Sequence, residues 1–522
     1  MKKTVTLRLT PEEAFSTDLH THVLKKSAFQ SSDCVYVQIQ KRSIDARKKK
    51  VWVNIQADIY VNELPDSQSF SKEYRDVRNS EEVIIIGAGP AGLFAALRLI
   101  ELGVKPIVLE RGKDVRARRR DLAAINKEHI VNPESNYCFG EGGAGTYSDG
   151  KLYTRSKKRG DLQRILEILV AHGAKDDILY DAHPHIGTNK LPKIVQALRE
   201  TIVEYGGEVR FDSKVVDFII EQDSLKGVKL LDNSFINAKA ILLATGHSAR
   251  DIFHLLNDRK VKIESKPFAL GVRVEHPQAL IDSIQYSCDG DRGEYLPASS
   301  YALVNQTYLD NEQRGVFSFC MCPGGFIVPS ATSPGEVVVN GMSPSRRDSR
   351  FANSGIVVAV ENSDLKDYSK YGELAAMKFQ QKVEQDAFRL GGETQVAPAQ
   401  RLVDFVNGKI SNQLNETSYQ PGLNSVDMRT VLPEFIHARL KMAFKGFGKK
   451  MKGYLTNEAQ IVGVESRTSS PVRVPRDKET LEHVELKGLF PCGEGAGYAG
   501  GIVSAAMDGE RCAEAIVNKY YN

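Results

Sequence analysis

Small residues set among apolar ones carry the clearest chemical signal in this chain. The segment from Glu82 to Arg111 reads EVIIIGAGPAGLFAALRLIELGVKPIVLER. A buried strand leads into GAGPAG, and a helix with apolar spacing and a second strand follow. Gly87 and Gly89 permit a tight turn and a close approach to a pyrophosphate, while Gly92 lets the helix pack against the strand. The helix N-terminus would offer free N–H groups and a positive dipole end to the phosphates.

A carboxylate stands where this arrangement needs one. Glu110 ends the second strand, about 18 residues after Gly92, where it can accept hydrogen bonds from a ribose diol. Strand, glycine turn, helix, second strand and acid occur in the required order, so we predict a dinucleotide site. Its first segment comprises Gly87, Ala88, Gly89, Pro90, Ala91, Gly92 and Glu110.

Two further stretches could complete such a site. Arg111 opens a very basic run that includes Arg118; it is either a solvated helix face or the source of one or two arginines that reach adenylate phosphates. The loop NYCFGEGGAGTYSDGKL (136–152) holds five glycines between positions 140 and 150, which excludes a stable helix or central strand. It favours close approach to a flat ligand at Gly143 and Gly145, with a flexible surface loop as the alternative.

Candidate reactive side chains are few, and each has a structural alternative. Cys320 and Cys322 would point the same way on a strand, either as a reactive pair or as ordinary packing. His247 is a candidate proton donor or a cap of the following helix, and Lys151 with Asp149 could lie on a cofactor. We predict no catalytic residue beyond these weak candidates, and no metal site, because the cysteine pair lacks a second ligand pair. The run SPSRRDSR (343–350) is either a solvated turn or a site for an anionic substrate, and the two histidines of HPH (183–185) are expected to pack in a loop.

Composition sets the broad class. The 522 residues carry 41% hydrophobic and 26% charged residues with a net charge of +4, as in an ordinary soluble globular protein. This charge does not argue for nucleic acid or a membrane as a partner. The seven scattered cysteines imply no disulfide framework, and the N-terminus lacks an apolar signal core, so we expect a cytoplasmic protein. The partner we expect is a small-molecule substrate, and the oligomeric state stays open.

The periodicity along the chain divides it into parts. We predict a small β-α-β-β domain at 1–64, with one helix from Pro11 to about Phe29, and a linker at 65–80. An α/β domain with a Rossmann-like parallel sheet and a β-meander spans 81–260 and resumes at 481–522. Strands alternate with helices in a different style over 261–480, which predicts an inserted α+β cap domain.

Three separated blocks carry a family resemblance: GAGPAG with Glu110, ILLATG (241–246), and GLFPCGEGAGYAGGIVSAAMDG (488–509). Together they resemble flavoproteins of the glutathione-reductase and para-hydroxybenzoate-hydroxylase type. More closely, the chain resembles a group of uncharacterised bacterial FAD-dependent dehydrogenases, which share FGEGGAGTYSDGKL and PCGEGAGYAGGI. The resemblance covers about residues 80–522 and implies FAD, without specifying a substrate.

The resemblance also implies roles for residues of this chain. Gly87, Gly89 and Gly92 would hold the pyrophosphate, Glu110 the adenosine ribose, and Glu494 a ribityl hydroxyl in place of the more common aspartate. A helix that begins near Gly501 would aim its N–H groups at the flavin pyrimidine edge and raise its potential. The remaining cofactor contacts would come from Arg111, Val215 or Val216, Ala244, Thr245, Gly246, Gly493 and Ile502.

The sequence therefore predicts an FAD-dependent oxidoreductase that exchanges a hydride with a small molecule between the FAD domain and the cap. A second GxGxxG after a strand is missing, so a dedicated NAD(P)H domain is not expected; NAD(P)H stays possible as a transient electron donor. Two alternatives are a flavin-containing protein that binds or modifies RNA, motivated by the basic turn at 45–50, and a flavin sensor or scaffold without turnover.

Overall fold

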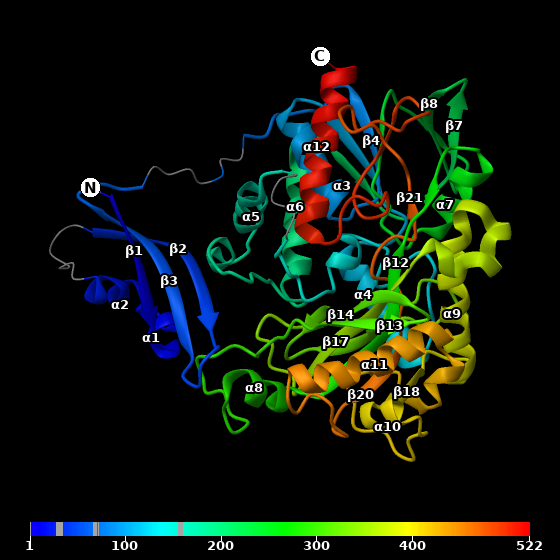
Figure 1. Cartoon of the computed structure of the whole chain (residues 1–522). Coiled ribbons are helices and arrows are strands. Elements are labelled where there is room, and N and C mark those ends of the chain that lie inside the picture. Colours follow the sequence, from blue (N-terminus) through cyan, green and yellow to red (C-terminus); the bar gives the residue numbers. More distant parts are fainter. Residues whose placement is uncertain (1, 28–34, 66–69, 71–72, 155–159, 522) are drawn as a thin grey trace.

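The protein is described by a computed structural model that covers residues 2–27, 35–65, 70, 73–154 and 160–521. A small N-terminal domain stands beside a larger body in which the C-terminal helix α12 (Ile502–Tyr520) runs next to α3 (Pro90–Glu101) (Figure 1). No helix in the described ranges is long and apolar enough to cross a membrane.

The N-terminal domain is a three-stranded antiparallel sheet covered by two short helices. Its strands are β1 (Lys2–Leu9), β2 (Val35–Asp45) and β3 (Trp52–Val61), in the order β1-β3-β2. The expected single helix is instead α1 (Pro11–Phe15) and α2 (Leu19–Lys26), because Ser16 adopts an extended backbone at ψ 163°. The capping box of Thr10 and Glu13 is present, and the end of the predicted helix lies outside the described residues.

The central domain contains the predicted parallel sheet. Its strands run in the order β22-β10-β4-β5-β6, with β4 (Glu82–Ile86) in the middle and buried from Val83 onward. The flanking strands are β5 (Lys105–Leu109), β6 (Glu208–Arg210), β10 (Ile241–Leu243) and β22 (Leu489–Pro491), so the last of them comes from the far end of the chain. An antiparallel meander follows β6 and consists of β7 (Val215–Glu221), β8 (Ser224–Leu230) and β9 (Phe235–Asn237).

Helices cover this sheet and bring the two ends of the chain together. A Cβ at Gly509 of α12 would lie 2.1 Å from the carbonyl oxygen of Ala91 in α3, so only glycine allows this approach. The other helices of the domain are α4 (Val115–Glu128), α5 (Leu162–Ala171), α6 (Leu191–Glu204) and α7 (Arg250–Asp258), with short 3-10 turns η1 (Gly143–Gly145) and η2 (Asp176–Leu179).

The predicted linker at 65–80 is not a spacer along its whole length. Tyr74 and Val77 are buried in the core of the central domain, and the Val77 amide donates to the Tyr205 carbonyl at 2.9 Å. The polar residues around Tyr74 and Val77 made the segment resemble a linker, although these two side chains anchor it to the central domain.

The third part is a cap built on a mixed sheet with the strand order β13-β14-β17-β12-β20-β18-β19. These strands are β12 (Phe268–Pro277), β13 (Val304–Leu309), β14 (Glu312–Cys322), β17 (Phe351–Val360), β18 (Ala397–Arg401), β19 (Leu423–Ser425) and β20 (Gln460–Glu465). Two small pairs, β11 (Glu264–Ser265) with β21 (Val472–Arg473) and β15 (Phe326–Pro329) with β16 (Val339–Met342), complete the strands. The helices are α8 (Gln278–Tyr286), α9 (Ala375–Gly391), α10 (Leu402–Asn407) and α11 (Glu434–Lys450), with 3-10 segments η3 (Asn362–Leu374) and η4 (Met428–Thr430).

Candidate functional site

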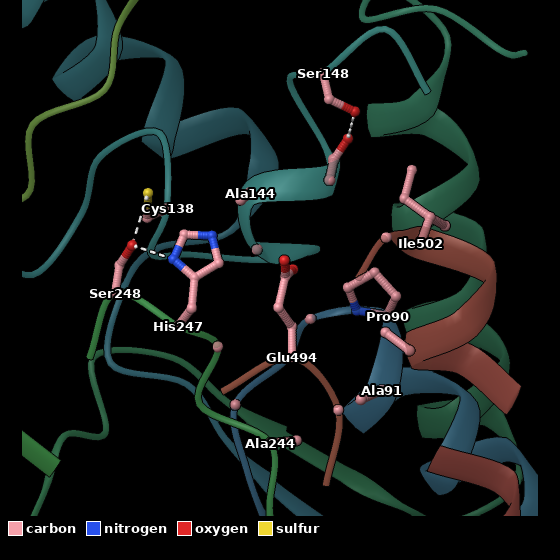
Figure 2. A pocket seen from close by; sticks show the side chains of 18 of the residues that line it. Pro90, Ala91, Cys138, Ala144, Ser148, Ala244, His247, Ser248, Glu494 and Ile502 are labelled. Carbon is pink, nitrogen blue, oxygen red and sulfur yellow. Dashed lines mark hydrogen bonds between the residues drawn. The ribbon is translucent and has the colours of Figure 1, made fainter. Parts of the chain in front are cut away.

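One cavity collects residues from the carboxyl ends of the parallel strands, the glycine-rich loop, α12 and the cap sheet. Figure 2 shows part of its lining, with residues of the strand ends, the glycine-rich loop and α12. Carboxyl ends of parallel strands are where open α/β sheets bind ligands. Most of the predicted contacts line this cavity: Gly87, Gly89, Pro90, Ala91, Glu110, Arg111, Gly143, Gly145, Val215, Ala244, Thr245, Gly246, Gly493, Glu494, Gly501 and Ile502. Ala88, Gly92, Arg118 and Val216 do not line it.

The glycine turn shapes the floor of the cavity. Gly87 has φ +106°, and a Cβ there would lie 2.5 Å from the Ala244 carbonyl oxygen, so the turn closes only on glycine. A Cβ at Gly92 would lie 2.0 Å from the Gly87 carbonyl oxygen, which is the close helix–strand packing expected of it. At Gly89 a Cβ would meet nothing within 4 Å, and this N-cap residue provides no side-chain hydrogen bond to α3. The first N–H groups of α3 are therefore open to an anion in the cavity.

Glu110 is bound by the backbone more completely than a ribose-binding role requires. Oε2 accepts from the Ala88 amide, and Oε1 accepts from the amides of Gly112 and Gly140, each at 2.9 Å. A carboxylate has about four acceptor positions, so about one is left for a ribose hydroxyl. Glu110 therefore also joins the glycine turn to the glycine-rich loop.

Arg118 does not reach the cavity, and the prediction that it contacts phosphates is wrong. The side chain is fully buried and donates to the carbonyls of Asn136 at 2.7 Å, Glu141 at 2.9 Å and Gly143 at 3.0 Å. Arg118 therefore stabilises the conformation of the glycine-rich loop from the side away from the cavity. Arg111 does line the cavity, where its guanidinium lies 4.6 Å from the ring centroid of Phe139 and pairs with Asp251.

The meander supplies one of the two expected valines. Val215 lines the cavity, whereas Val216 does not, because successive residues of a strand face opposite sides. Ala88 and Gly92 lie behind the wall for a different reason: they belong to the packed turn itself.

The C-terminal block closes the other side of the cavity. A Cβ on Gly145 would lie 3.2 Å from Ile502 and 3.5 Å from Pro90, so the glycine-rich loop, α12 and α3 meet at one point. Gly501 caps α12 with φ +141°, without a side-chain hydrogen bond and with nothing within 4 Å of its Cβ position. A second helix N-terminus is thus open to the same cavity.

Glu494 extends into the cavity beside the α3 end, and in the view of Figure 2 its side chain lies between His247 and Pro90. Among the described residues its carboxylate has no hydrogen-bond or ion-pair partner. Burial raises its pKa to about 7, although nearby Lys266 opposes the rise. At pH 7 this carboxylate is about half ionised, and it receives no hydrogen bond from the protein, so it suits a ligand whose hydroxyl groups can donate to it.

His247 lies on the cavity wall and does not cap the next helix. The N-cap residue of α7 is Ala249, and it makes no side-chain cap bond. The His247 Nδ1 atom instead lies 3.0 Å from the Ser248 hydroxyl, which lies 3.5 Å from the Cys138 sulfur (Figure 2). Burial lowers the pKa of His247 to about 4, so the imidazole is neutral at pH 7.

The two cysteines of the cap differ from the sequence expectation. A bulge lies between Phe319 and Cys322, and Cys320 adopts φ +44°, so the regular alternation that would align the thiols is broken. Both line the cavity as free thiols. The Cys320 side chain is exposed where it lines the cavity, yet the protein atoms around it desolvate the thiol and raise its pKa to about 11, which disfavours the thiolate a redox thiol needs.

Lys151 and Asp149 end the glycine-rich loop at the boundary with the cap. The Lys151 ammonium donates to the Met321 carbonyl of β14. Asp149 pairs with Arg347 through two bonds of 3.1 and 2.6 Å, so part of the SPSRRDSR run serves this loop and is not simply solvated.

Several cavity residues carry no recognisable sequence signal. Phe319, Asn340 and Arg467 come from separate elements of the cap. Arg467 donates to Glu336 and Glu384, which also accept from Arg250 at the start of α7, so a buried ion cluster joins the cap to the central domain. Only the tertiary structure brings these residues together.

A second cluster, one member of which (Cys492) lines the cavity, consists of residue types that can bind a metal but surrounds an arginine. Cys492, Asp508 and Cys512 gather their ligand atoms within 4.8 Å of one another. The Arg476 guanidinium lies 3.0 Å from Asp508 Oδ2 and 3.2 Å from Cys512 Sγ, where a metal would have to sit. This geometry makes the cluster a buried arginine site.

Comparisons with known proteins agree with this arrangement. An uncharacterised protein from Clostridium beijerinckii is 40% identical over 520 residues and covers 96% of both chains. This chain belongs to the same family. Family models match a domain of unknown function at 1–60, an FAD-binding domain at 80–135, and the C-terminal domain-like part of FAD-dependent proteins at 267–468. The chain is thus an FAD-dependent flavoprotein of the oxidoreductase superfamily.

More distant relatives cover only parts of the chain. A probable fumarate reductase, Ifc3, from Shewanella frigidimarina is 26% identical over 39% of this chain, which spans 37% of that protein. The solved structure of glycine oxidase from Bacillus cereus aligns with 85% of this chain and 96% of its own chain, at 13% identity and a TM-score of 0.31.

Proposed function

We propose that this protein is an oxidoreductase that binds FAD in the cavity and exchanges a hydride with a small molecule between the central domain and the cap. The observation that carries the proposal is the convergence of two open helix N-termini, those of α3 and α12, with the unpartnered Glu494 in one cavity. When bound, FAD would supply the two-electron chemistry.

The residues of this chain would hold the cofactor at several points along its length. The α3 N-terminus at Gly89 and Ala91 would bind the pyrophosphate, and Glu494 would accept a hydrogen bond from a ribityl hydroxyl. The α12 N-terminus at Gly501 would favour negative charge on the flavin. Arg111 and Val215 would flank the adenosine part, and Glu110 would contact its ribose with the one acceptor position it has left.

The cap would exclude water and position the substrate. Phe319, Asn340 and Arg467 form cavity wall from the cap side, and the ion cluster of Arg467, Glu384 and Arg250 fixes that wall to α7. Excluding water strengthens electrostatic contacts in such a site and protects a hydride transfer from side reactions. His247 would act as a neutral hydrogen-bonding group, held by Ser248.

The first test is purification of the full chain and identification of its cofactor. We expect a yellow protein from which denaturation releases FAD, and whose absorbance bleaches on photoreduction and returns with an electron acceptor. A colourless chain that neither binds nor refolds with FAD would refute the proposal. Mixing the oxidised protein with NADH or NADPH under anaerobic conditions tests nicotinamide as a transient donor.

The alternatives from the sequence gain nothing here. A tRNA uridine 5-carboxymethylaminomethyl modification enzyme from Caldicellulosiruptor saccharolyticus is 27% identical, but over only 33% of this chain and 25% of its own length, which does not carry RNA modification over to this chain. The basic turn that motivated RNA binding pairs Arg47 with Asp45 and sets Lys50 over the ring of Trp52. A sensor or scaffold role would require a flavin that reoxidises with no acceptor in a metabolite panel.

A further inference from the structure

One part of the cavity is separate from the two helix N-termini and the glycine turn that would bind a dinucleotide. It is formed by the end of the glycine-rich loop and by the cap sheet, and we term it the cap-side wall. Its residues are Lys151, Tyr153, Thr154, Phe319, Cys320 and Asn340. The two domains meet here, since Lys151 donates to the Met321 carbonyl on β14.

Lys151 shares its counter-charge with another cation. Asp149 Oδ2 lies 3.9 Å from Lys151 Nζ, which is within the range of an ion pair but beyond hydrogen-bond distance. Both Asp149 oxygens are instead engaged by Arg347, at 3.1 and 2.6 Å. Two positive groups and one negative group therefore meet at this end of the cavity.

The neighbouring charged groups do not change this balance. Arg467 is matched by Glu336 and Glu384, which also match Arg250. Behind Asn340, Arg273 is paired with the buried Glu465.

The neutral groups of the region stay neutral at pH 7. His185 forms an isolated antiparallel β-bridge with Lys151. Burial and the nearby Arg347 lower the pKa of its imidazole. Enclosure raises the thiol pKa of Cys320 to about 11. Neither group supplies a negative charge to offset Lys151.

Donors remain on both sides of the wall. An ammonium has three N–H groups, and the Met321 carbonyl uses one of those on Lys151. Asn340 Oδ1 accepts from the Gly341 amide at 2.7 Å, and in the described part of the chain its amino group makes no hydrogen bond. An anion entering this wall would find a charged donor from one domain and a neutral donor from the other.

We propose that the cap-side wall binds the carboxylate of an anionic small-molecule substrate, with Lys151 as the charged donor and Asn340 as the neutral donor. This inference rests on the proposed function, because it assigns the substrate class of the same site. Lys151 would anchor the substrate and position its oxidisable carbon, and FAD would not be held by it.

The test uses the FAD-loaded full chain and simple probes. Acetate, benzoate and phenylacetate are titrated while the flavin absorbance is recorded, and each is compared with its neutral amide. We expect at least one acid to perturb the spectrum saturably and to bind about 10- to 100-fold more tightly than its amide, as for a hydrogen bond to a charged group.

Variants identify the residue responsible. Lys151→Met is expected to weaken the acid about 10- to 100-fold and to leave the amide unchanged, whereas Lys151→Arg retains most of the affinity. Lys175→Met, at an exposed lysine outside the cavity, is the matched control and should bind like the wild type.

The outcomes separate the two proposals. A chain without FAD rejects the proposed function. A yellow, photoreducible protein rejects the carboxylate inference alone if none of the three acids binds, if acids and amides bind equally, or if Lys151→Met keeps full affinity for the acid.

Discussion

Glu494 offers a pH-dependent test of the cavity, because its carboxylate stands among open helix ends without a protein partner. Burial raises its pKa from an ordinary value of 4.5 to about 7. Between these two values the unfolded chain has lost the proton and the folded protein keeps it. The free energy of unfolding of the FAD-free protein should therefore fall as the pH rises through this interval, and stay level below and above it.

The size of the effect follows from the interval. At 1.36 kcal/mol for each pKa unit, the change from 4.5 to about 7 corresponds to about 3 kcal/mol. The variant Glu494→Gln cannot ionise, so it should match the wild type near pH 4.5 and exceed it by about 3 kcal/mol at pH 8. For a domain of about 200 residues this gain amounts to an increase in Tm of roughly 6–12 °C.

Thermal unfolding of FAD-free wild type and Glu494→Gln at several pH values measures this difference. Glu458→Gln is the matched control, since Glu458 is exposed and lies outside the cavity. A stability gain in Glu494→Gln that is the same at pH 5 and pH 8 would refute the reasoning. So would a wild type whose stability relative to the variant does not fall with pH.

A rise in pH, which lowers the stability of the FAD-free protein through Glu494, should increase its affinity for FAD through the same carboxylate. An ionised Glu494 accepts hydrogen bonds from hydroxyl groups better than a protonated one. FAD should therefore bind the wild type more tightly as the pH rises through 7, and this pH dependence should disappear in Glu494→Gln.

Three further predictions test other parts of the structure. Gly509→Ala would place a Cβ 2.1 Å from the Ala91 carbonyl oxygen, so it should push α12 away from α3 and lower the free energy of unfolding by about 1–3 kcal/mol or more. Absorbance spectra should then show a reduced FAD content. Gly500→Ala, where a Cβ would meet nothing within 4 Å, should retain FAD. The thiol of Cys320, with a pKa of about 11, should be alkylated by iodoacetamide at pH 8 much more slowly than a cysteine thiol of ordinary pKa, as followed by mass spectrometry. Rapid labelling would contradict its neutral state. Arg42→Ala removes an ion pair with Asp181 that has two hydrogen bonds, of 2.7 and 3.0 Å. Hydrogen exchange should therefore rise at residues 180–186, where the N-terminal domain contacts the central domain. Unchanged exchange there would argue against this contact.

The sequence determined the elements whose cause is local. The GAGPAG turn, the strand before it and the helix after it follow from apolar periodicity and from glycines that no other residue can replace at Gly87 and Gly92. The parallel sheet was predictable for the same reason. The burial of Tyr74 was not, because it depends on packing against residues far along the chain. The break at Ser16, where the hydroxyl bonds locally to the Glu13 carbonyl and accepts from the Asp18 amide, was also missed.

The site divides in the same way. Residues inside motifs, such as Gly89 and Glu494, lie where their motifs predicted, in the cavity. Arg118 does not, because a basic run gives no information on which arginine turns inward to bind the carbonyls of a loop. Asn340 and Arg467 belong to no motif at all.

The order of small, apolar and acidic residues is enough to specify a dinucleotide turn, since its geometry involves neighbours within one strand-helix-strand unit. The charge at the cap-side wall is a different kind of property. It depends on Arg347, almost two hundred positions away, donating to both oxygens of Asp149, so that Lys151 keeps only a 3.9 Å ion pair with a carboxylate that it shares. Such a balance exists only once the cap folds against the glycine-rich loop, so it is decided by the tertiary structure and not by any local pattern.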